Sequence, residues 1–171
     1  MDKGYGQSDP RLARYVEQVF APADPILDGI VERQRAAGMP EINVSRVDGL
    51  HLEVIARATG AKRAVEIGTL GGYSGVCLLR GMEPDGLLHT FELEPRHAEV
   101  ARASFREAGV EARVRLHVGP ASEKLAEIEG EGPFDLVFVD ADKLGYPMYL
   151  AWAAKHLRVG GVLLGDNAFL F

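Results

Sequence analysis

The chain has 171 residues, of which 47% are hydrophobic and 26% are charged, proportions that fit one soluble globular domain. Its net charge of −6 argues against a nucleic-acid binder that relies on broad phosphate neutralisation. No apolar stretch approaches the roughly 20 residues that span a bilayer, so we expect no membrane partner. The single cysteine, Cys77, excludes an internal disulfide and favours a cytoplasmic location, where we expect it to be a buried small hydrophobe.

Residues 1–60 are predicted to form a helical region that precedes the rest of the domain. Its first ten residues are polar and lack a signal-peptide core. Asp24 and Pro25 suit the N-cap and first position of one helix, and Ser45 could cap the next. The helices predicted here cover residues 9–20, 25–37 and 45–60.

Residues 61–171 alternate between apolar strands and helices. The predicted strands cover residues 63–67, 87–92, 113–118, 134–139 and 161–164. The predicted helices cover residues 72–80, 95–108, 122–128 and 146–157. Strands this apolar, separated by helices, predict an α/β fold with a mainly parallel sheet that is buried on both faces. Ligands of such sheets bind beyond the carboxyl ends of the strands, so the residues just after each strand are the candidates for function.

The first strand ends in a glycine-rich turn at residues 66–74, EIGTLGGYS. Gly68 would let a ligand approach the backbone closely, although a plain strand-to-helix turn remains an alternative. The pattern is not the dinucleotide G-x-G-x-x-G, because Leu70 stands where a second glycine is expected. The carboxylate of Glu66 would also repel a diphosphate, whereas a cationic nucleoside without phosphate would accept it.

The second and third strands end in residues that suit the rest of a nucleoside. Glu92 ends the second strand 24 residues after Gly68, where a carboxylate can accept hydrogen bonds from ribose hydroxyls. Glu94 is better interpreted as a charge or cap at the start of the following helix. Small residues at 119–121 leave room for a flat adenine, and Ser122 is interpreted as a helix cap.

The fourth and fifth strands deliver oxygen donors to one edge of the sheet. Asp140 follows the fourth strand, and Asp166 and Asn167 follow the fifth. Such donors, completed by waters, suit Mg²⁺ or a similar hard cation. Lys143 lies close in sequence, where a base beside a metal-held hydroxyl would be useful. The alternative is that Asp140 and Asp142 are helix caps and that the Asp166–Asn167 pair forms a turn.

Three segments, residues 66–74, 134–143 and 160–167, resemble the cation-dependent O-methyltransferases, the catechol and caffeoyl-CoA O-methyltransferase family and its bacterial branch in particular. The resemblance covers roughly residues 9–168, and its most specific part is the D-A-D-K block with the later D-N pair. It implies a Rossmann-like methyltransferase fold and transfer of a methyl group from S-adenosylmethionine to a hydroxyl of a small catechol-like or phenolic acceptor. Mg²⁺ or another hard divalent cation would assist that transfer.

The resemblance also implies a role for individual residues. The cofactor-binding residues would be Val44, Glu66, Gly68, Thr69, Ser74, Glu92, Ala121 and Asp140. Glu66 and Gly68 would bind the methionine end of the cofactor, and Ser74 its carboxylate. Glu92 would hold the ribose and Ala121 would border the adenine. The metal ligands would be Asp140, Asp166 and Asn167, and the catalytic residues Lys143, as general base, and Asp140.

The chain departs from this family at its C-terminal end. Family members continue with a further helix and two more strands, so we expect the chain to be truncated and the fifth strand to have a bare edge. An open apolar edge invites pairing with another chain, which favours a homodimer. Two alternative functions stay open, a non-catalytic cofactor-binding relative that dimerises and a nicotinamide-dependent oxidoreductase. Leu70, Glu66 and the metal-type residues count against the second.

Overall fold

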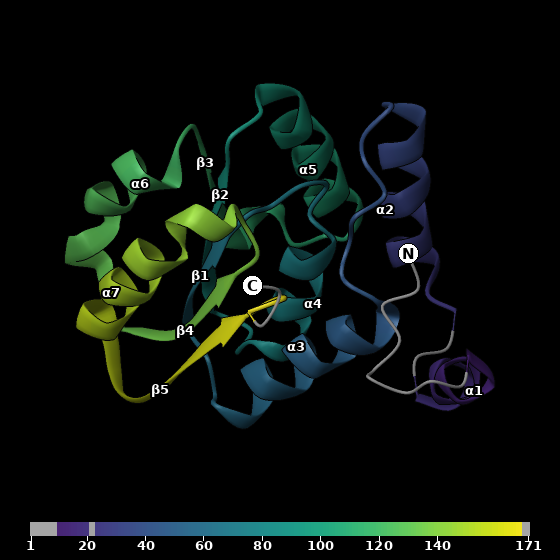
Figure 1. Ribbon diagram of the computed structural model, residues 1–171, viewed down its shortest axis with the longest axis horizontal. Coiled ribbons are helices and arrows are strands. Elements are labelled where there is room, and N and C mark those ends of the chain that lie inside the picture. The colour runs from purple at the N-terminus through teal and green to yellow at the C-terminus, as the bar shows by residue number, and fades with distance from the viewer. Residues whose placement is uncertain (1–9, 21–22, 169–171) are drawn as a thin grey trace.

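The computed structural model describes residues 10–20 and 23–168 of the chain. The predictions made for residues 1–9 lie outside the described residues, as do residues 169–171. A central sheet is flanked by helices on both sides (Figure 1). Figure 1 places α6 and α7 on one side of the sheet and the N-terminal helices, α4 and α5 on the other.

The N-terminal region forms the three predicted helices. They are α1 (Pro10–Phe20), α2 (Pro25–Ala36) and α3 (Arg46–Ala58). The carboxylate of Asp24 accepts hydrogen bonds from the first backbone N–H groups of α2. Ser45 and Asp48 form a reciprocal capping box at the start of α3. Both caps satisfy donors that have no partner inside the helix, which confirms the predicted helix starts.

The sheet has five parallel strands in the order β3-β2-β1-β4-β5. They are β1 (Arg63–Ile67), β2 (Leu87–Glu92), β3 (Val114–Val118), β4 (Phe134–Val139) and β5 (Leu157–Gly165). The predicted mainly parallel α/β fold is therefore confirmed. The chain runs from β1 outward to β2 and β3, and then returns to add β4 and β5 on the other side of β1. The carboxyl ends of β1 and β4 thus form a topological switch point, where open α/β sheets bind ligands.

The helices of this part are α4 (Tyr73–Gly81), α5 (Pro95–Glu107), α6 (Ala121–Lys124) and α7 (Tyr146–His156), with short 3₁₀ segments η1 (Glu111–Arg113), η2 (Leu125–Glu131) and η3 (Lys143–Gly145). The helix predicted over 122–128 is helical throughout, divided between α6 and the 3₁₀ segment η2. The buried side chains of Leu125 and Ile128 are three residues apart, a spacing that matches the three residues per turn of a 3₁₀ helix. Ser122 lies inside α6 and does not cap it. In the described residues, no helix is long and apolar enough to cross a membrane.

Strand β5 begins at Leu157, four residues earlier than predicted. Its pairing with β4 shifts, because Phe134 pairs with Leu157 whereas Leu136 pairs with Val162. Gly160, at φ +78°, lies within this irregularity. The sequence indicates a loop here, between the predicted helix and the predicted strand. Glycine tolerates this left-handed conformation and lets the strand bulge without ending.

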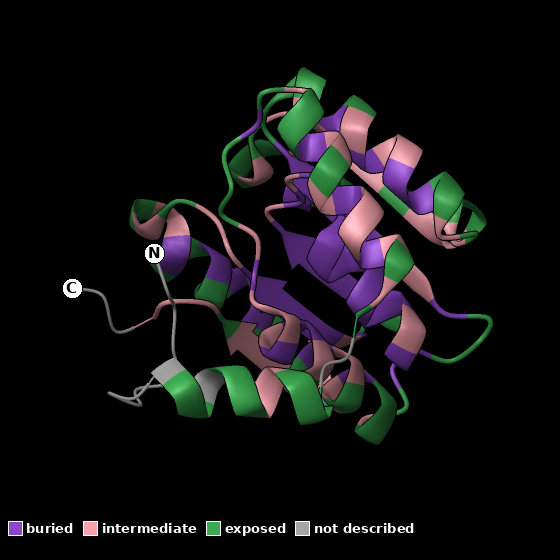
Figure 2. Cartoon of the chain, turned by 90° about the vertical axis from the view of Figure 1, so that its right-hand side faces the viewer, coloured by how far each residue is buried: buried purple, intermediate pink, exposed green. Residues whose placement is uncertain are grey.

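Two apolar cores lie on opposite faces of the sheet (Figure 2). In β4, Leu136 and Phe138 contribute to the core under α2 to α5, and Val137 and Val139 to the core under η2 and α7. Burial on both faces explains why this strand is a continuous apolar run. Cys77 is buried in the first core, as predicted.

Candidate functional site

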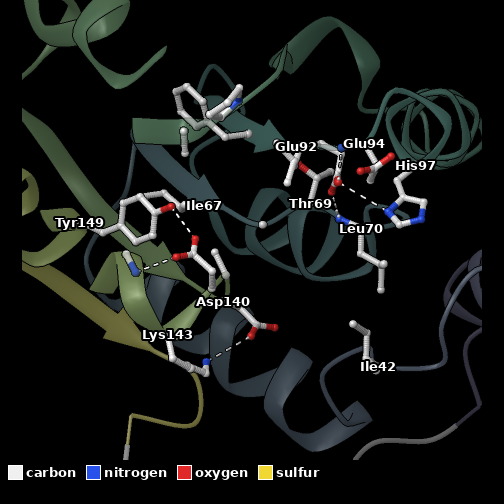
Figure 3. A pocket seen from close by; sticks show the side chains of 18 of the residues that line it. Ile42, Ile67, Thr69, Leu70, Glu92, Glu94, His97, Asp140, Lys143 and Tyr149 are labelled. Atoms are coloured by element: carbon white, nitrogen blue, oxygen red, sulfur yellow. Dashed lines mark hydrogen bonds and ion pairs between the residues drawn. The ribbon is translucent and has the colours of Figure 1, made fainter. Parts of the chain in front are cut away.

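A cavity of about 940 Å³ opens at the carboxyl edge of the sheet (Figure 3). Its walls come from the segments after all five strands and from the connection between α2 and α3. The predicted site residues that line it are Val44, Gly68, Thr69, Ser74, Glu92, Ala121, Asp140, Lys143 and Asn167. Two others, Glu66 and Asp166, are not among the residues that line it. The structure therefore gathers most of the predicted residues around one cavity.

The turn after β1 is held against the end of β4. Gly68 has φ +101°, and a Cβ atom added there would lie 2.0 Å from the carbonyl oxygen of Asp140. Side-chain-bearing residues are excluded from this position both by conformation and by space. Leu70, in the same turn, adopts φ 50°, an uncommon conformation for a residue with a side chain. Its backbone N–H donates to Glu92 Oε2 at 2.7 Å, and this bond holds the strained turn.

Glu66 lies beneath the cavity, with no exposed side-chain surface. Its carboxylate accepts hydrogen bonds from the hydroxyls of Ser74 and Thr90, each at 2.6 Å. Burial raises the pKa of Glu66 to about 7, and the negative charges of Asp140 and Glu92 act in the same direction, against the hydroxyl hydrogen bonds. Ser74 lines the cavity and Glu66 does not, and the contact of Glu66 with the methionine end of a cofactor stays a prediction.

Glu92 lines the cavity and joins three segments of the chain. Its Oε2 accepts from the backbone of Leu70, and its Oε1 accepts from the N–H of Glu94 at 2.9 Å. His97 Nδ1, from the first turn of α5, lies 3.5 Å from the same Oε1 (Figure 3). Glu94 occupies the N-cap position of α5 without a side-chain capping bond, and it lines the cavity instead. Sequence reasoning missed His97, although its place just after the acidic strand end was a usable signal.

The ends of β4 and β5 bring the predicted acidic residues and the lysine together. Lys143 Nζ lies 4.0 Å from Asp140 Oδ1 and donates hydrogen bonds to the Asp166 carbonyl oxygen and the Tyr146 hydroxyl, both at 2.8 Å. The backbone N–H of Asp166 donates to the carbonyl oxygen of Val139 at 2.9 Å, which fixes the β5 end beside the β4 end. Sequence reasoning did not foresee the role of Tyr146.

Asp142 makes contacts different from those of Asp140 and Lys143. Its side chain accepts hydrogen bonds from the Gly145 backbone at 2.6 Å and from the Tyr149 hydroxyl at 2.7 Å. Asp142 is the N-cap of η3, which confirms for this residue the alternative that it is a helix cap. Asp140 caps no helix among the described residues and lines the cavity.

The residues predicted to hold a metal are, by chemical type, oxygen donors that suit a hard divalent cation. Within the described part of the chain, no group of three or more His, Cys, Asp or Glu residues is placed to hold a metal. The candidate set combines two carboxylates, Asp140 and Asp166, with the amide oxygen of Asn167, which lines the same cavity as Asp140. Oxygen donors with waters are the ligands that Mg²⁺ takes, and they are poor ligands for structural zinc.

The charge of the cavity also restricts what it binds. Its wall carries the carboxylates of Glu92, Glu94, Asp140 and Asp142, and the ammonium group of Lys143. This balance disfavours an anionic diphosphate and favours a neutral or cationic ligand.

Comparison with known proteins gives a consistent result. A family model described as O-methyltransferase matches residues 17–171. A catechol O-methyltransferase of Mycobacterium tuberculosis is 43% identical over 158 residues, which are 92% of this chain and 71% of that protein. Two solved structures are similar over 92% of this chain. The O-methyltransferase of Bacillus cereus in complex with SAH has a TM-score of 0.89 at 39% identity, with 72% of it covered. The O-methyltransferase TomG of Streptomyces achromogenes, involved in tomaymycin synthesis and in complex with SAM, has a TM-score of 0.87 at 40% identity, with 71% covered.

Proposed function

The chain belongs to the O-methyltransferase family, and on that premise we propose that it transfers a methyl group from S-adenosylmethionine to a hydroxyl of a small catechol-like acceptor, assisted by a divalent cation. One observation carries this proposal. The glycine turn after β1 packs directly on the carbonyl of Asp140, so a nucleoside bound at the turn and a cation bound by Asp140 would share one cavity. Methyl transfer needs this closeness, because the donor and acceptor must meet in line.

The cofactor side of the cavity suits a cationic nucleoside. S-adenosylmethionine, when bound, supplies a methyl group on an electrophilic sulfonium. Glu92 and Ala121 line the cavity, where Glu92 would accept hydrogen bonds from ribose hydroxyls and Ala121 would border the adenine. Ser74 would bind the methionine carboxylate, while Thr69, Gly68 and Val44 border the same end. Glu66, beneath the wall, would be ionised by a nearby cation and would then stabilise that cation.

The acceptor side is formed by the ends of β4 and β5. Asp140, Asp166 and Asn167 would hold the divalent cation, which supplies a Lewis acid that lowers the pKa of neighbouring hydroxyls. Lys143 would act as the general base and accept the hydroxyl proton at Nζ. Its hydrogen bonds to Tyr146 and to the Asp166 carbonyl fix the position of that nitrogen.

The rim of the cavity supports an aromatic acceptor. Ile42, Leu144 and Met148 line it and are exposed, Leu144 to 96%. Exposed apolar side chains at the mouth of a concave site favour a flat apolar ligand. The volume of about 940 Å³ lies within the range of cavities that hold drug-sized ligands.

We further propose that the protein is a homodimer, a single domain over residues 1–171, and located in the cytoplasm. Helix α1 supports the dimer, because it exposes the apolar side chains of Leu12, Tyr15, Val19 and Phe20, which a second copy could cover. The single buried thiol of Cys77 is consistent with a reducing compartment. Light scattering of the purified protein tests the dimer, and a monomer at micromolar concentration would contradict it.

The function is tested with methyl-labelled S-adenosylmethionine and a panel of acceptors that includes catechols, monophenols and aliphatic alcohols. We expect label to reach a vicinal diol first, and transfer to require Mg²⁺. Calorimetry with S-adenosylmethionine and with NAD separates this function from an oxidoreductase. Binding of NAD without binding of S-adenosylmethionine would overturn the proposal.

A further inference from the structure

A pair of amide side chains connects α2 to the wall of the cavity. Gln34 of α2 is 2% exposed, and its Nε2 donates to Asn43 Oδ1 at 3.0 Å. Asn43 Nδ2 donates back to Gln34 Oε1 at 2.7 Å. Each amide thus gives one hydrogen bond and receives one, which satisfies a buried polar group that would otherwise be costly.

Gln34 also packs on the glycine turn. A Cβ atom added at Gly71 would lie 2.3 to 2.5 Å from the Nε2, Cδ and Cγ atoms of Gln34. The Gln34 side chain therefore rests on the backbone of Gly71. Asn43 lines the cavity itself, so the amide pair links the glycine turn to the segment 40–44.

Segment 40–44 forms part of the cavity wall beside the turn. Pro40, Ile42 and Val44 line the cavity with Asn43, and Figure 3 shows the side chains of Ile42 and Leu70 pointing toward each other. Glu41, on the same segment, instead pairs with Arg35, with both side chains more than 60% exposed. Exposed ion pairs contribute little to stability, whereas the amide pair is largely shielded from water.

We propose that Gln34 and Asn43 are positioning residues that hold segment 40–44 against the glycine turn, and so set the affinity for the cofactor. A wall that is ordered before binding lowers the entropic cost of binding. This inference rests on the proposed function for the identity of the ligand. Gln34 does not line the cavity, and because the proposed effect is on binding, the chemical step at saturating cofactor is not expected to change.

The first test is Asn43→Ala, with Glu41→Gln as the matched control on the same segment. We expect the dissociation constant for S-adenosylmethionine, measured by calorimetry, to rise about tenfold in Asn43→Ala, because two hydrogen bonds are lost. The KM for the cofactor should rise in parallel while kcat stays unchanged. In the ligand-free protein, hydrogen exchange at the amides of Ile42 and Val44 should become faster. Glu41→Gln should leave all these quantities within about twofold of the wild type.

A second variant approaches the pair from its buried side. Gln34→Met keeps the length of the side chain and fills the same space without an amide. It should weaken cofactor binding to a similar degree. The double variant with Asn43→Ala should bind the cofactor as tightly as either single variant, because both substitutions remove the same interaction.

Three outcomes would overturn the inference. In the first, the wild type binds S-adenosylmethionine and Asn43→Ala binds it equally well with unchanged exchange; then only this inference fails. In the second, the wild type binds no S-adenosylmethionine at all, and then the proposed function fails together with it. Equal losses in Glu41→Gln and Asn43→Ala would also contradict a specific role for the amide pair.

Discussion

The two sides of the cavity are built differently. The proposed cofactor side is lined by Gly68, Thr69, Leu70, Ser74 and Glu92, and the proposed cation side by Asp140, Lys143 and Asn167, with Asp166 next to Asn167 in the chain. On the cofactor side the carboxylates are engaged from within the fold: Glu66 accepts from two hydroxyls, and Glu92 from two backbone N–H groups. On the cation side, the side chains of Asp140 and Lys143 are 29% and 33% exposed.

This difference indicates that one side is preformed and the other depends on what binds. A buried carboxylate held by several hydrogen bonds keeps its position in the absence of ligand. Asp140 and Lys143, partly exposed and 4.0 Å apart, interact through a higher effective dielectric. A bound cation can therefore reorient the Asp140 carboxylate, whereas Lys143 stays held by Tyr146 and the Asp166 carbonyl. We therefore expect variants of the cofactor side to change binding and stability, and variants of the cation side to change turnover.

The largest effect is expected on the cation side from Asp140→Ala. Methyl transfer should fall by about a thousandfold or more, because several kcal/mol of charge stabilisation are lost with the cation. The affinity for S-adenosylmethionine should fall much less. Circular dichroism should show an intact fold. The neighbouring Asp142→Asn keeps an oxygen acceptor for the Gly145 N–H and serves as control, with an expected loss below about tenfold. Equal losses in the two variants would break the distinction between these carboxylates.

The second largest effect is expected from Gly68→Ala, which should disturb both the glycine turn and the end of β4. The new Cβ would lie 2.0 Å from the Asp140 carbonyl oxygen and would force a residue with a side chain to φ +101°. We expect a loss of about 2–4 kcal/mol in the free energy of unfolding together with loss of cofactor binding. Gly109→Ala is the control, since Gly109 also has a positive φ (+70°) but no atom within 4 Å. It should cost only about 1 kcal/mol. Equal destabilisation in the two variants would show that the contact with Asp140 has no role.

A smaller effect is expected from Glu66→Gln, which at pH 8 should raise the stability of the ligand-free protein and lower its affinity for the cofactor. The pKa of Glu66 in the folded protein, about 7, is above its ordinary value, so its favourable contribution is complete below pH about 4.5 and is lost as the pH rises through 7. At pH 8 the neutral glutamine should stabilise the ligand-free protein by about 2 kcal/mol, and at pH 5 it should change little. Cofactor affinity should fall at pH 8. Urea unfolding at both pH values measures this, and a destabilised variant at pH 8 would contradict the account.

The smallest effect concerns a pair of histidines in β2 and β3, which would otherwise be confused with Glu66 in a pH profile. His89 Nδ1 lies 3.1 Å from His117 Nε2, and His89 Nε2 lies 3.2 Å from Glu131. Burial lowers the pKa of both histidines, against the nearby charges of Glu131 and Glu127, while Lys124 and Arg115 reinforce it.

A lowered histidine pKa means that the unfolded chain binds more protons, so stability is complete above pH about 6.5 and is lost as the pH falls below it. His117→Gln should reduce the loss of unfolding free energy at acidic pH (the acidic limb) by less than about 1 kcal/mol. It should leave the change between pH 5 and 8 that is due to Glu66 as it is in the wild type. An unchanged acidic limb in unfolding curves of His117→Gln would assign that limb to other groups.

Much of the fold and of the cavity could be predicted from the sequence, because both depend on local signals. The apolar runs of β1 and β4, the caps at Asp24 and Ser45, and acidic residues placed directly after strands are all visible in one dimension. Parallel strands then bring their carboxyl ends to one edge of the sheet. For this reason the sequence alone predicts that Glu92 and Asp140 line the same cavity.

The features that could not be predicted depend on contacts between distant residues. Leu70 adopts a left-handed conformation because Glu92, 22 residues later, holds its N–H. Glu66 lies beneath the cavity because Thr90 and Ser74 engage it from two other elements. The early start of β5 follows from a bulge that only the pairing with β4 reveals. The spacing of residues in the sequence does not predict such contacts.

The most direct test of the account compares binding and turnover in one preparation before and after removal of divalent cations. S-adenosylmethionine affinity and methyl transfer to a catechol would be measured with Mg²⁺, with excess EDTA, and with Mg²⁺ restored. The account predicts that EDTA abolishes transfer reversibly while cofactor affinity stays within a fewfold range, because the preformed side binds without the cation. Undiminished transfer in EDTA, or loss of cofactor binding together with transfer, would contradict it.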